Sequence, residues 1–187
     1  MKGRDRLDDE TSKTSWCSKA GKEKYMRVRD LMTDVPYFCR PGTDLGTATE
    51  YMWEGNCGFL PVVGEDSKIV GVVTDRDLCI AFGTRNRLPG QISVGEVMSR
   101  RVFSCLPEDD IHVALRSMRE GEVRRLVVLN GDETLAGVIS LDDILCRAEP
   151  FNLRNFPELT SDEVVKTFKA INRRQVPQAA FKRGAAA

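Results

Sequence analysis

An internal repeat constrains the fold of this chain more than any other feature of the sequence. When the sequence is shifted by 66 positions, residues 28–78 align with residues 94–144 without a gap. The first-copy residues with an identical partner in the second copy are Val28, Met32, Cys39, Pro41, Asp44, Ala48, Met52, Glu54, Gly55, Leu60, Val62, Asp66, Gly71, Val72 and Asp77. A fixed period of this kind is the signature of a duplicated structural unit. We therefore predict two copies of one small fold.

Each copy shows the same order of predicted elements. A brief strand (37–39; 102–104) precedes an amphipathic helix, whose apolar residues recur at the i, i+3, i+7 spacing of a half-buried helix. Two apolar strands follow (58–63 with 69–73; 124–129 with 135–139), joined by turn-rich links. A second helix begins at Asp75 or Leu141. The predicted fold class is α/β, in the broad α+β sense, with β-α-β-β-α twice and pseudo-two-fold packing of the copies.

The bulk properties exclude several classes of protein. Twenty-eight basic and 28 acidic residues cancel, which argues against a nucleic-acid partner. A nucleic-acid-associated regulator, with the basic ends Arg173-Arg174 and Lys182-Arg183 on the phosphate backbone, stays as a weaker alternative. No apolar run approaches the ~20 residues of a transmembrane helix, and the N-terminus lacks the apolar stretch of a secretory signal. We therefore expect a cytoplasmic protein with no membrane partner. Six cysteines without CxxC spacing and a single histidine, His112, predict no metal site.

The flanks of the repeat differ from the repeat itself. Residues 1–25 are charged and polar, which predicts a disordered tail. Residues 26–88 and 89–149 form the two predicted copies, and residues 150–187 form an extension with one short helix. The capping-box pattern Thr160-Ser-Asp-Glu163 opens that helix. Its apolar residues are Val164, Val165, Phe168 and Ile171. We expect that face to dock on the core or on a twin subunit, with a partner-binding helix as the alternative.

In each copy, the junction between the third strand and the second helix allows two interpretations. Thr74 and Asp77 in the first copy match Ser140 and Asp143 in the second. A hydroxyl at the N-cap and an acid three residues later are a sufficient helix cap. However, the reciprocal box prefers the longer Glu or Gln at the third position. A helix N-terminus also binds phosphate, and a nearby carboxylate accepts ribose hydroxyls in dinucleotide-binding folds. Both the cap and the nucleotide site stay open at this point.

The motifs of the two copies resemble the cystathionine-β-synthase (CBS) domain. The first copy carries VRDLMT, GFLPVV and GVVTDRDL, and the second carries VGEVMS, RRLVVLN and GVISLDDI. The resemblance covers about residues 26–149. Two tandem copies are similar to the paired regulatory module that binds adenosine nucleotides. Duplication for stability alone is the other explanation, but ligand sites favour the cleft between packed units.

The resemblance implies roles for particular residues. The aspartate of each junction would bind ribose hydroxyls, and the hydroxyl residue would lie near ribose and phosphate. Basic residues before the L-P-V strand would reach phosphates, and the loop after M-[TS] would contact adenine. The residues in these roles are Thr74, Asp77, Ser140, Asp143, Arg124, Arg125, the loop from Thr33 to Val35 and the loop from Ser99 to Arg101. The first copy has Cys57-Gly58-Phe59 in place of the arginines, and the second has Val127 in place of Pro61. These departures predict unequal occupancy of the two sites.

No catalytic set is present, because the sequence lacks a Ser-His-Asp candidate, a P-loop and an H-E-x-x-H motif. We therefore expect a stand-alone, homodimeric sensor rather than an enzyme. Its ligand would be AMP, ADP or ATP, with S-adenosylmethionine or NAD as less favoured variants, and no cofactor is required. Binding would shift the angle between the copies or the position of the C-terminal helix, and an unknown protein target would respond. The alternative is a ligand-independent scaffold that binds other proteins.

Overall fold

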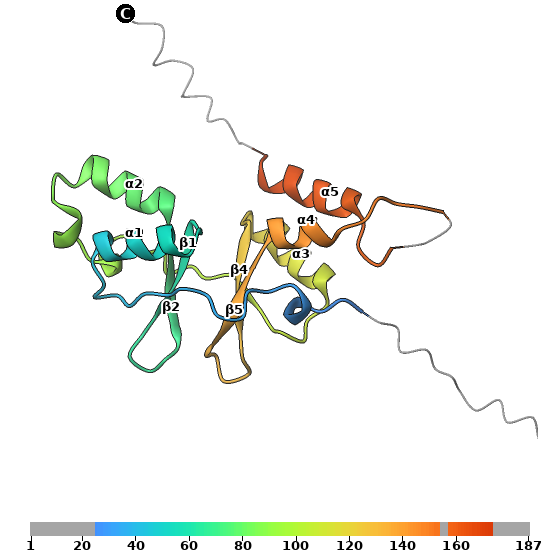
Figure 1. Cartoon of the computed structure of the whole chain (residues 1–187), viewed down its shortest axis with the longest axis horizontal. Helices are drawn as coiled ribbons and strands as arrows, with labels where there is room; N and C mark the ends of the chain where they lie inside the picture. The colour runs from blue at the N-terminus through green and yellow to red at the C-terminus, as the bar shows by residue number, and fades with distance from the viewer. Residues whose placement is uncertain (1–24, 154–156, 174–187) are drawn as a thin grey trace, which may run out of the picture.

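The computed structural model describes residues 25–153 and 157–173, which form two halves side by side (Figure 1). The predicted polar tail covers residues 1–25, of which residues 1–24 lie outside the described residues. One half contains α1 (Leu45–Glu54), β1 (Phe59–Val63), β2 (Ile69–Thr74) and α2 (Asp75–Thr84). The other contains β3 (Ser104–Cys105), α3 (Ile111–Gly121), β4 (Arg125–Leu129), β5 (Leu135–Ser140), α4 (Leu141–Arg147) and α5 (Ser161–Ile171). Three 3-10 turns complete the fold, namely η1 (Val28–Asp30), η2 (Pro89–Gln91) and η3 (Val94–Glu96).

The predicted fold class is confirmed, with one difference between the copies. In both, two antiparallel strands form a hairpin with the same register, and the second helix begins at the predicted residue. In the second copy the brief first strand is β3, which pairs in parallel with β4. In the first copy only Cys39 pairs, with Val62. Pro36 precedes this segment where the second copy has Val102, and proline has no backbone N–H to donate to a ladder.

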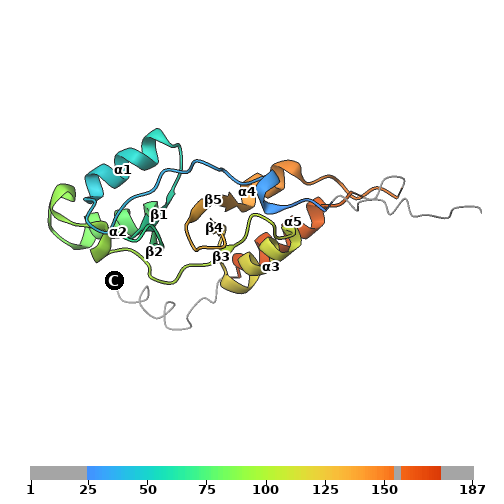
Figure 2. The same ribbon diagram turned by 90° about the horizontal axis from the view of Figure 1, so that it is seen from below.

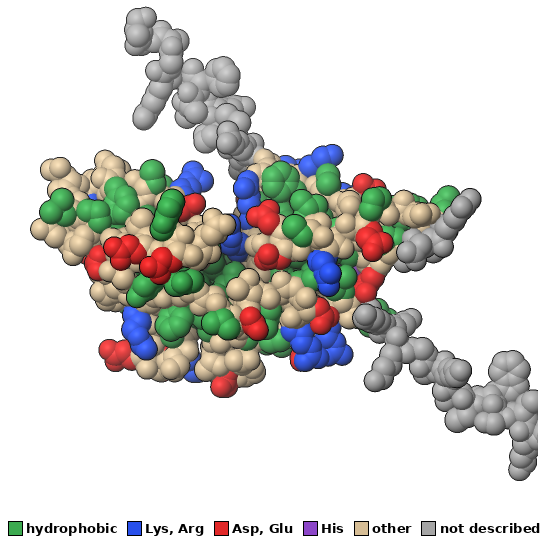
Figure 3. All heavy atoms as spheres, viewed as in Figure 1, with side chains coloured by type: hydrophobic (Ala, Val, Ile, Leu, Met, Phe, Trp, Pro, Cys, Tyr) green, Lys and Arg blue, Asp and Glu red, His purple; other side chains and the backbone are tan. Residues whose placement is uncertain are grey.

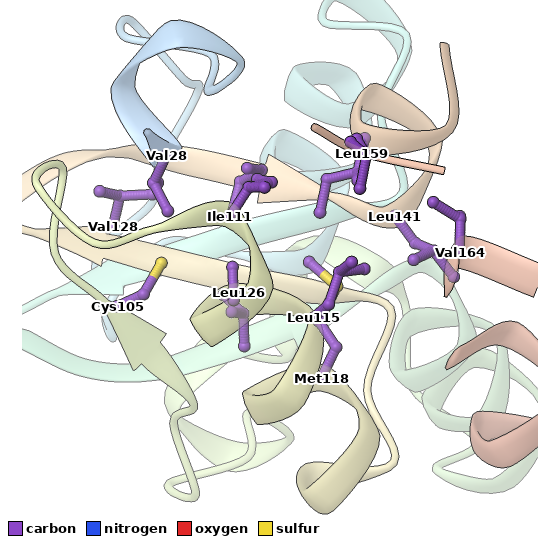
Figure 4. Close-up of a cluster of buried hydrophobic side chains, with 13 residues drawn as sticks. Val28, Cys105, Ile111, Leu115, Met118, Leu126, Val128, Leu141, Leu159 and Val164 are labelled. Atoms are coloured by element: carbon purple, nitrogen blue, oxygen red, sulfur yellow. The ribbon is translucent and has the colours of Figure 1, made fainter. Parts of the chain in front are cut away.

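The two hydrophobic cores exchange their leading segments. Val28 of η1 is buried in the core of the second copy, beside Val128 of β4 (Figure 4). Val94 of η3 is buried in the core of the first copy. Matched backbone hydrogen bonds hold the two segments: Val28 N donates to Asp109 O at 2.9 Å, and Val94 N donates to Thr43 O at 2.8 Å. Each core is therefore completed by a segment from the other copy.

The loops that follow η1 and η3 cross to the opposite hairpin. Thr33 exchanges backbone hydrogen bonds with Val138, and Ser99 exchanges them with Val72. A Cβ atom at Gly137 would lie 2.5 Å from Thr33 O, and one at Gly71 would lie 2.7 Å from Ser99 O. These two glycines therefore allow the crossing loops to approach the strands. The loop of each copy is placed beside the strand-to-helix junction of the other.

Helix α5 covers the helical side of the second copy. It packs against α3 and α4, and the first two views agree on its place beside α3 (Figures 1 and 2). Val164 is only 1% exposed and belongs to the core of that copy, where Ile171 packs at its edge. Val165 and Phe168, which the sequence placed on the docking face, are 43% and 47% exposed. The buried stripe instead runs through Val164, Thr167 and Ile171, because the i, i+3, i+7 spacing follows the helix more closely.

Two cysteines occupy equivalent positions in the two cores. Cys39 and Cys105 are buried, and burial raises the pKa of each thiol to about 12. All five cysteines of the described chain are free. The buried pair therefore acts as small apolar side chains within the packing.

Candidate functional site

The two strand-to-helix junctions have the same cap geometry. Thr74 N and Thr74 Oγ1 donate to Asp77 Oδ2 at 2.9 and 2.7 Å, and Asp77 N donates back to Thr74 Oγ1 at 3.3 Å. Ser140 and Asp143 repeat this pattern at 2.8, 2.6 and 3.1 Å. The reciprocal box therefore forms in both copies with Asp at the third position, so the general preference for Glu or Gln does not count against a cap here. The aspartate side chain reaches the N-cap residue, where its Oδ2 accepts hydrogen bonds from both the backbone N–H and the hydroxyl group.

The cap uses only one oxygen of each carboxylate. Within the described part of the chain, no hydrogen bond engages Asp77 Oδ1 or Asp143 Oδ1. Each carboxylate is thus fixed in place and still has an acceptor oxygen. Since a carboxylate oxygen accepts hydrogen bonds from hydroxyl groups, both junctions are suited to a ribose.

One cavity beside the first junction, pocket A, has a volume of about 430 Å³ and is built by both copies. The first copy contributes the junction at Thr74 and Asp77, and the second contributes Ser99 and Arg101 from its crossing loop. The remaining lining residues are Gly58, Phe59, Val72, Asp75, Arg76, Phe103, Glu122, Val123, Arg124 and Arg125. A ligand here would touch both copies.

A second cavity, pocket B, has a volume of about 400 Å³. It contains the junction at Ser140 and Asp143 together with Thr33 and Val35 of the other crossing loop. The remaining lining residues are Pro36, Tyr37, Gly55, Asn56, Cys57, Phe59, Arg125, Val138 and Asp142. Pocket B is the counterpart of pocket A under the 66-residue repeat.

The two pockets share one wall and differ in charge. Phe59 and Arg125, which are equivalent positions of the repeat, line both cavities. Pocket A has three further arginines, at 76, 101 and 124, whose counterparts are Asp142, Val35 and Gly58. Four arginines therefore face three carboxylates in pocket A, whereas one arginine faces two carboxylates in pocket B.

None of these four arginines forms an ion pair with a carboxylate among the residues that the structure describes. The Arg101 guanidinium stacks over the Phe103 ring at 4.7 Å from the ring centre. Arg124 donates a hydrogen bond to the neutral Asn172 and stacks over the Phe168 ring. Lys and Arg side chains gather along the hollow between the two halves (Figure 3). Unpaired guanidinium groups in a cavity are suited to bind an anion, above all phosphate.

The structure brings the sequence-predicted residues together in a different combination from the one implied. Arg124 lies in the same copy as Asp143, yet it lines the pocket of Asp77. Arg125 lines both pockets, and Thr33 and Val35 join Ser140 and Asp143 in pocket B. The sequence did not single out Arg76, Phe103, Phe59 or Tyr37. Phe103 and Tyr37 are aromatic at equivalent positions of the repeat, and this signal was present in the alignment.

Two further observations concern other kinds of site. Within residues 25–153 and 157–173, no group of three or more His, Cys, Asp and Glu side chains could hold a metal ion. His112 instead contacts Asp110 at 2.7 Å. No helix in the same residues is long and apolar enough to cross a membrane.

Sequence comparison identifies the family. The sequence model of the CBS domain matches residues 28–83 and again residues 94–148. The chain belongs to the CBS domain family. The resemblance seen in the motifs is therefore confirmed, and the two halves are a tandem CBS pair.

The curated relatives share the CBS pair but differ in length. The CBS domain-containing protein YhcV of Bacillus subtilis is 32% identical over 117 residues, which is 63% of this chain and 81% of that protein. An uncharacterized 33.4 kDa protein of Thermofilum pendens is also 32% identical, over 63% of this chain. This chain spans only 38% of that protein and 22% of a matched homoserine O-acetyltransferase of Methanosphaera stadtmanae.

Solved structures share the fold. The CBS domain protein PAE2072 of Pyrobaculum aerophilum, complexed with AMP, has a TM-score of 0.57 at 24% identity and covers 64% of this chain and 90% of its own. The CBS domain pair of protein MJ0100, in complex with 5′-methylthioadenosine and S-adenosyl-L-methionine, has a TM-score of 0.58 at 20% identity. It covers 64% of this chain and 93% of its own.

Proposed function

We propose that this chain is a regulatory CBS pair that binds an adenosine nucleotide, and that pocket A holds the phosphorylated ligand. The observation that carries this proposal is the group of four arginines without a carboxylate partner in the described chain, next to the junction of Thr74 and Asp77. Asp77 Oδ1 would accept ribose hydroxyls, and the arginines would bind the phosphates. Backbone groups of the Ser99 to Arg101 loop and the Phe59 ring would contact adenine.

Pocket B supports a weaker or different ligand. Its aspartate junction is the same, and Thr33 and Val35 occupy the place of the adenine-contacting loop. Its single arginine is shared with pocket A. AMP, in the PAE2072 complex, and S-adenosylmethionine, in the MJ0100 complex, are both adenosine compounds, which supports this class of ligand. S-adenosylmethionine, a cation at its sulfur, is the alternative ligand for pocket B.

The regulatory mechanism follows from the way both copies build each pocket. A ligand in pocket A contacts the α2 junction of one copy and the crossing loop of the other. It would favour one relative angle of the copies, and a protein target would bind that state. We propose no catalytic role for this chain. The five free cysteines of the described residues fit a reducing compartment such as the cytoplasm.

Isothermal titration calorimetry with AMP, ADP, ATP, adenosine, S-adenosylmethionine and NAD tests the proposal. We expect AMP, ADP or ATP to bind the wild-type chain, and Asp77→Ala to weaken that binding more than Asp143→Ala. Asp44→Ala is the matched control, because Asp44 also caps a helix, through Thr47 N at 3.0 Å, but lines neither pocket. Absence of binding by every adenosine compound at millimolar concentration would overturn the proposal.

A second candidate function, a protein-interaction module, is favoured by an apolar surface on the first copy. Trp53 of α1, which is 86% exposed, and the exposed Phe82 of α2 line one open hollow together with Pro89. Single exposed apolar residues are ordinary, but a group of them marks an interaction surface. A homodimer formed through this face of the first copy would also be compatible with the proposed nucleotide-binding function. Analytical ultracentrifugation of the wild-type chain and Trp53→Asp, with and without AMP, separates the two functions: association that ignores every nucleotide would favour the scaffold.

A further inference from the structure

Helix α5 contacts a residue that lines pocket A, although the helix lies outside the CBS family match, which ends at residue 148. Arg124 Nη2 donates to Asn172 Oδ1 at 2.6 Å, just beyond the last turn of α5. The Arg124 guanidinium also lies over the Phe168 ring, 5.3 Å from its centre. A side chain that lines the pocket is therefore fixed by two residues of the C-terminal extension.

The amide of Asn172 has only one orientation that satisfies its bonds. Asn172 Nδ2 donates to Phe168 O at 2.7 Å, one of the last carbonyls of α5. Its Oδ1 therefore points outward to accept from Arg124. The C-terminal end of a helix also attracts a cation, which favours the same place for the guanidinium.

These contacts fix Arg124 without neutralising it. Asn172 and Phe168 are uncharged, so the guanidinium keeps its full positive charge. The hydrogen bond occupies one of the five guanidinium N–H donors, and the others stay available to a phosphate. A carboxylate partner would instead compete with the phosphate for the same charge. The arrangement thus orders the side chain and leaves its binding capacity intact.

The helix that carries these residues is firmly docked. Val164 and Thr167, both 1% exposed, lie in the interface of α5 with the second copy. Glu163 caps α5 through Thr160 and lies 3.4 Å from His112 Nε2 of α3. Gly58, the counterpart of Arg124, has no side chain to fix. The contact is therefore specific to pocket A.

We propose that Phe168 and Asn172 are positioning residues for Arg124, and that α5 is thereby coupled to the phosphate of a ligand in pocket A. This inference rests on the proposed function of pocket A. A preordered arginine loses less side-chain entropy when it binds. Because coupling between two equilibria is reciprocal, a phosphate on Arg124 must also tighten the docking of α5. Adenosine, which lacks the phosphate, fills the pocket without this effect on the helix.

Calorimetric titration of Phe168→Leu and Asn172→Ala with AMP and with adenosine tests the positioning role. We expect AMP to bind about fivefold more weakly to each variant, and adenosine to bind as it does to the wild type. Val165→Ala, on the same helix and similarly exposed, is the matched control and should change neither affinity. In an Arg124→Met background, Asn172→Ala should have no additional effect on AMP, because the residue acts through Arg124.

Hydrogen exchange of the α5 amides tests the reciprocal effect. We expect AMP to slow exchange in residues 161–171 of the wild type, and adenosine at equal saturation to leave it unchanged. Equal AMP affinity of the wild type, Phe168→Leu and Asn172→Ala would overturn the inference and leave the proposed function standing. Equal loss of AMP and adenosine binding in the variants would also overturn it, since that outcome indicates a structural defect. Failure of every adenosine compound to bind the wild type would instead remove the proposed function itself.

Discussion

The two CBS copies share a scaffold and differ in what surrounds it. Both have the same hairpin register, the same capped junction and the same buried cysteine. Pocket A has arginines at 76, 101 and 124, whose counterparts in the repeat are Asp142, Val35 and Gly58, and of these counterparts Asp142 and Val35 line pocket B. Duplication has therefore preserved the residues that shape the pocket and changed the residues that set its charge. Unequal ligands in two equivalent cavities are the expected result.

The helical sides of the copies differ as well. Helix α5 covers α3 and α4 in the second copy, whereas Trp53 of α1 in the first copy is 86% exposed. The counterpart of Trp53 is Arg119, a charged residue. The helical side of the second copy is therefore covered by α5, whereas the helical side of the first copy leaves Trp53 open to solvent.

The largest effect that we expect is a loss of stability at the interface that α5 covers, compared with the exposed face of α1. Val164→Asp would bury a charge between α5 and the core of the second copy and should reduce the free energy of unfolding by about 3 kcal/mol. Trp53→Asp is the control on the uncovered side and should change it by less than about 0.5 kcal/mol. Urea denaturation followed by circular dichroism measures both values. Similar losses in the two variants would mean that the sides are equivalent.

The next largest effect that we expect is a change in AMP affinity when the charged residues of the two pockets are exchanged. Arg101→Val gives pocket A the residue of pocket B, and AMP should bind about tenfold more weakly because a charge-assisted contact is lost. Val35→Arg makes the opposite change and should strengthen AMP binding in pocket B. Titration calorimetry measures both, with Arg87→Met as a control, since Arg87 pairs with Glu96 away from both pockets. An unchanged affinity in Arg101→Val would show that charge does not separate the pockets.

The smallest effect concerns the α5 interface. Thr167 is 1% exposed, and its hydroxyl has no hydrogen-bond partner in the described chain. Thr167→Val replaces the hydroxyl with a methyl group of similar size and should stabilise the fold by about 1 kcal/mol. Thermal denaturation should show a rise in Tm of about 2–4 °C. The exposed Thr84, whose hydroxyl bonds Ile80 O at 2.6 Å, provides the control, and Thr84→Val should not raise Tm.

Much of the fold could be predicted from the sequence, because the repeat gives every local pattern twice. The helix starts at Asp75 and Leu141 follow from hydrophobic periodicity and from the caps, which are local properties of the sequence. The crossing of the two leading segments depends on contacts between residues about 80 positions apart, such as Val28 with Asp109. Periodicity within one copy carries no information on which copy a segment joins.

The candidate site was predicted residue by residue, and its assembly was not. The sequence singled out Asp77 and Arg124 separately, but only the crossing of the copies brings them into one cavity. The hydroxyl–aspartate box also differed from expectation, since a preference for glutamate does not exclude the shorter side chain. The contact of Asn172 with Arg124 depends on tertiary docking of α5, for which the sequence offers no local signal.

The exchanged leading segments have a consequence for how the chain folds. Val28 is needed in one core and Val94 in the other, so neither copy can complete its interior before the other has formed. The sequence contains two repeats, but its smallest cooperative folding unit is the pair. A chain cut between them would leave each fragment with an unfilled core and a segment that belongs elsewhere. We therefore expect folding to be all-or-none at the level of the duplication.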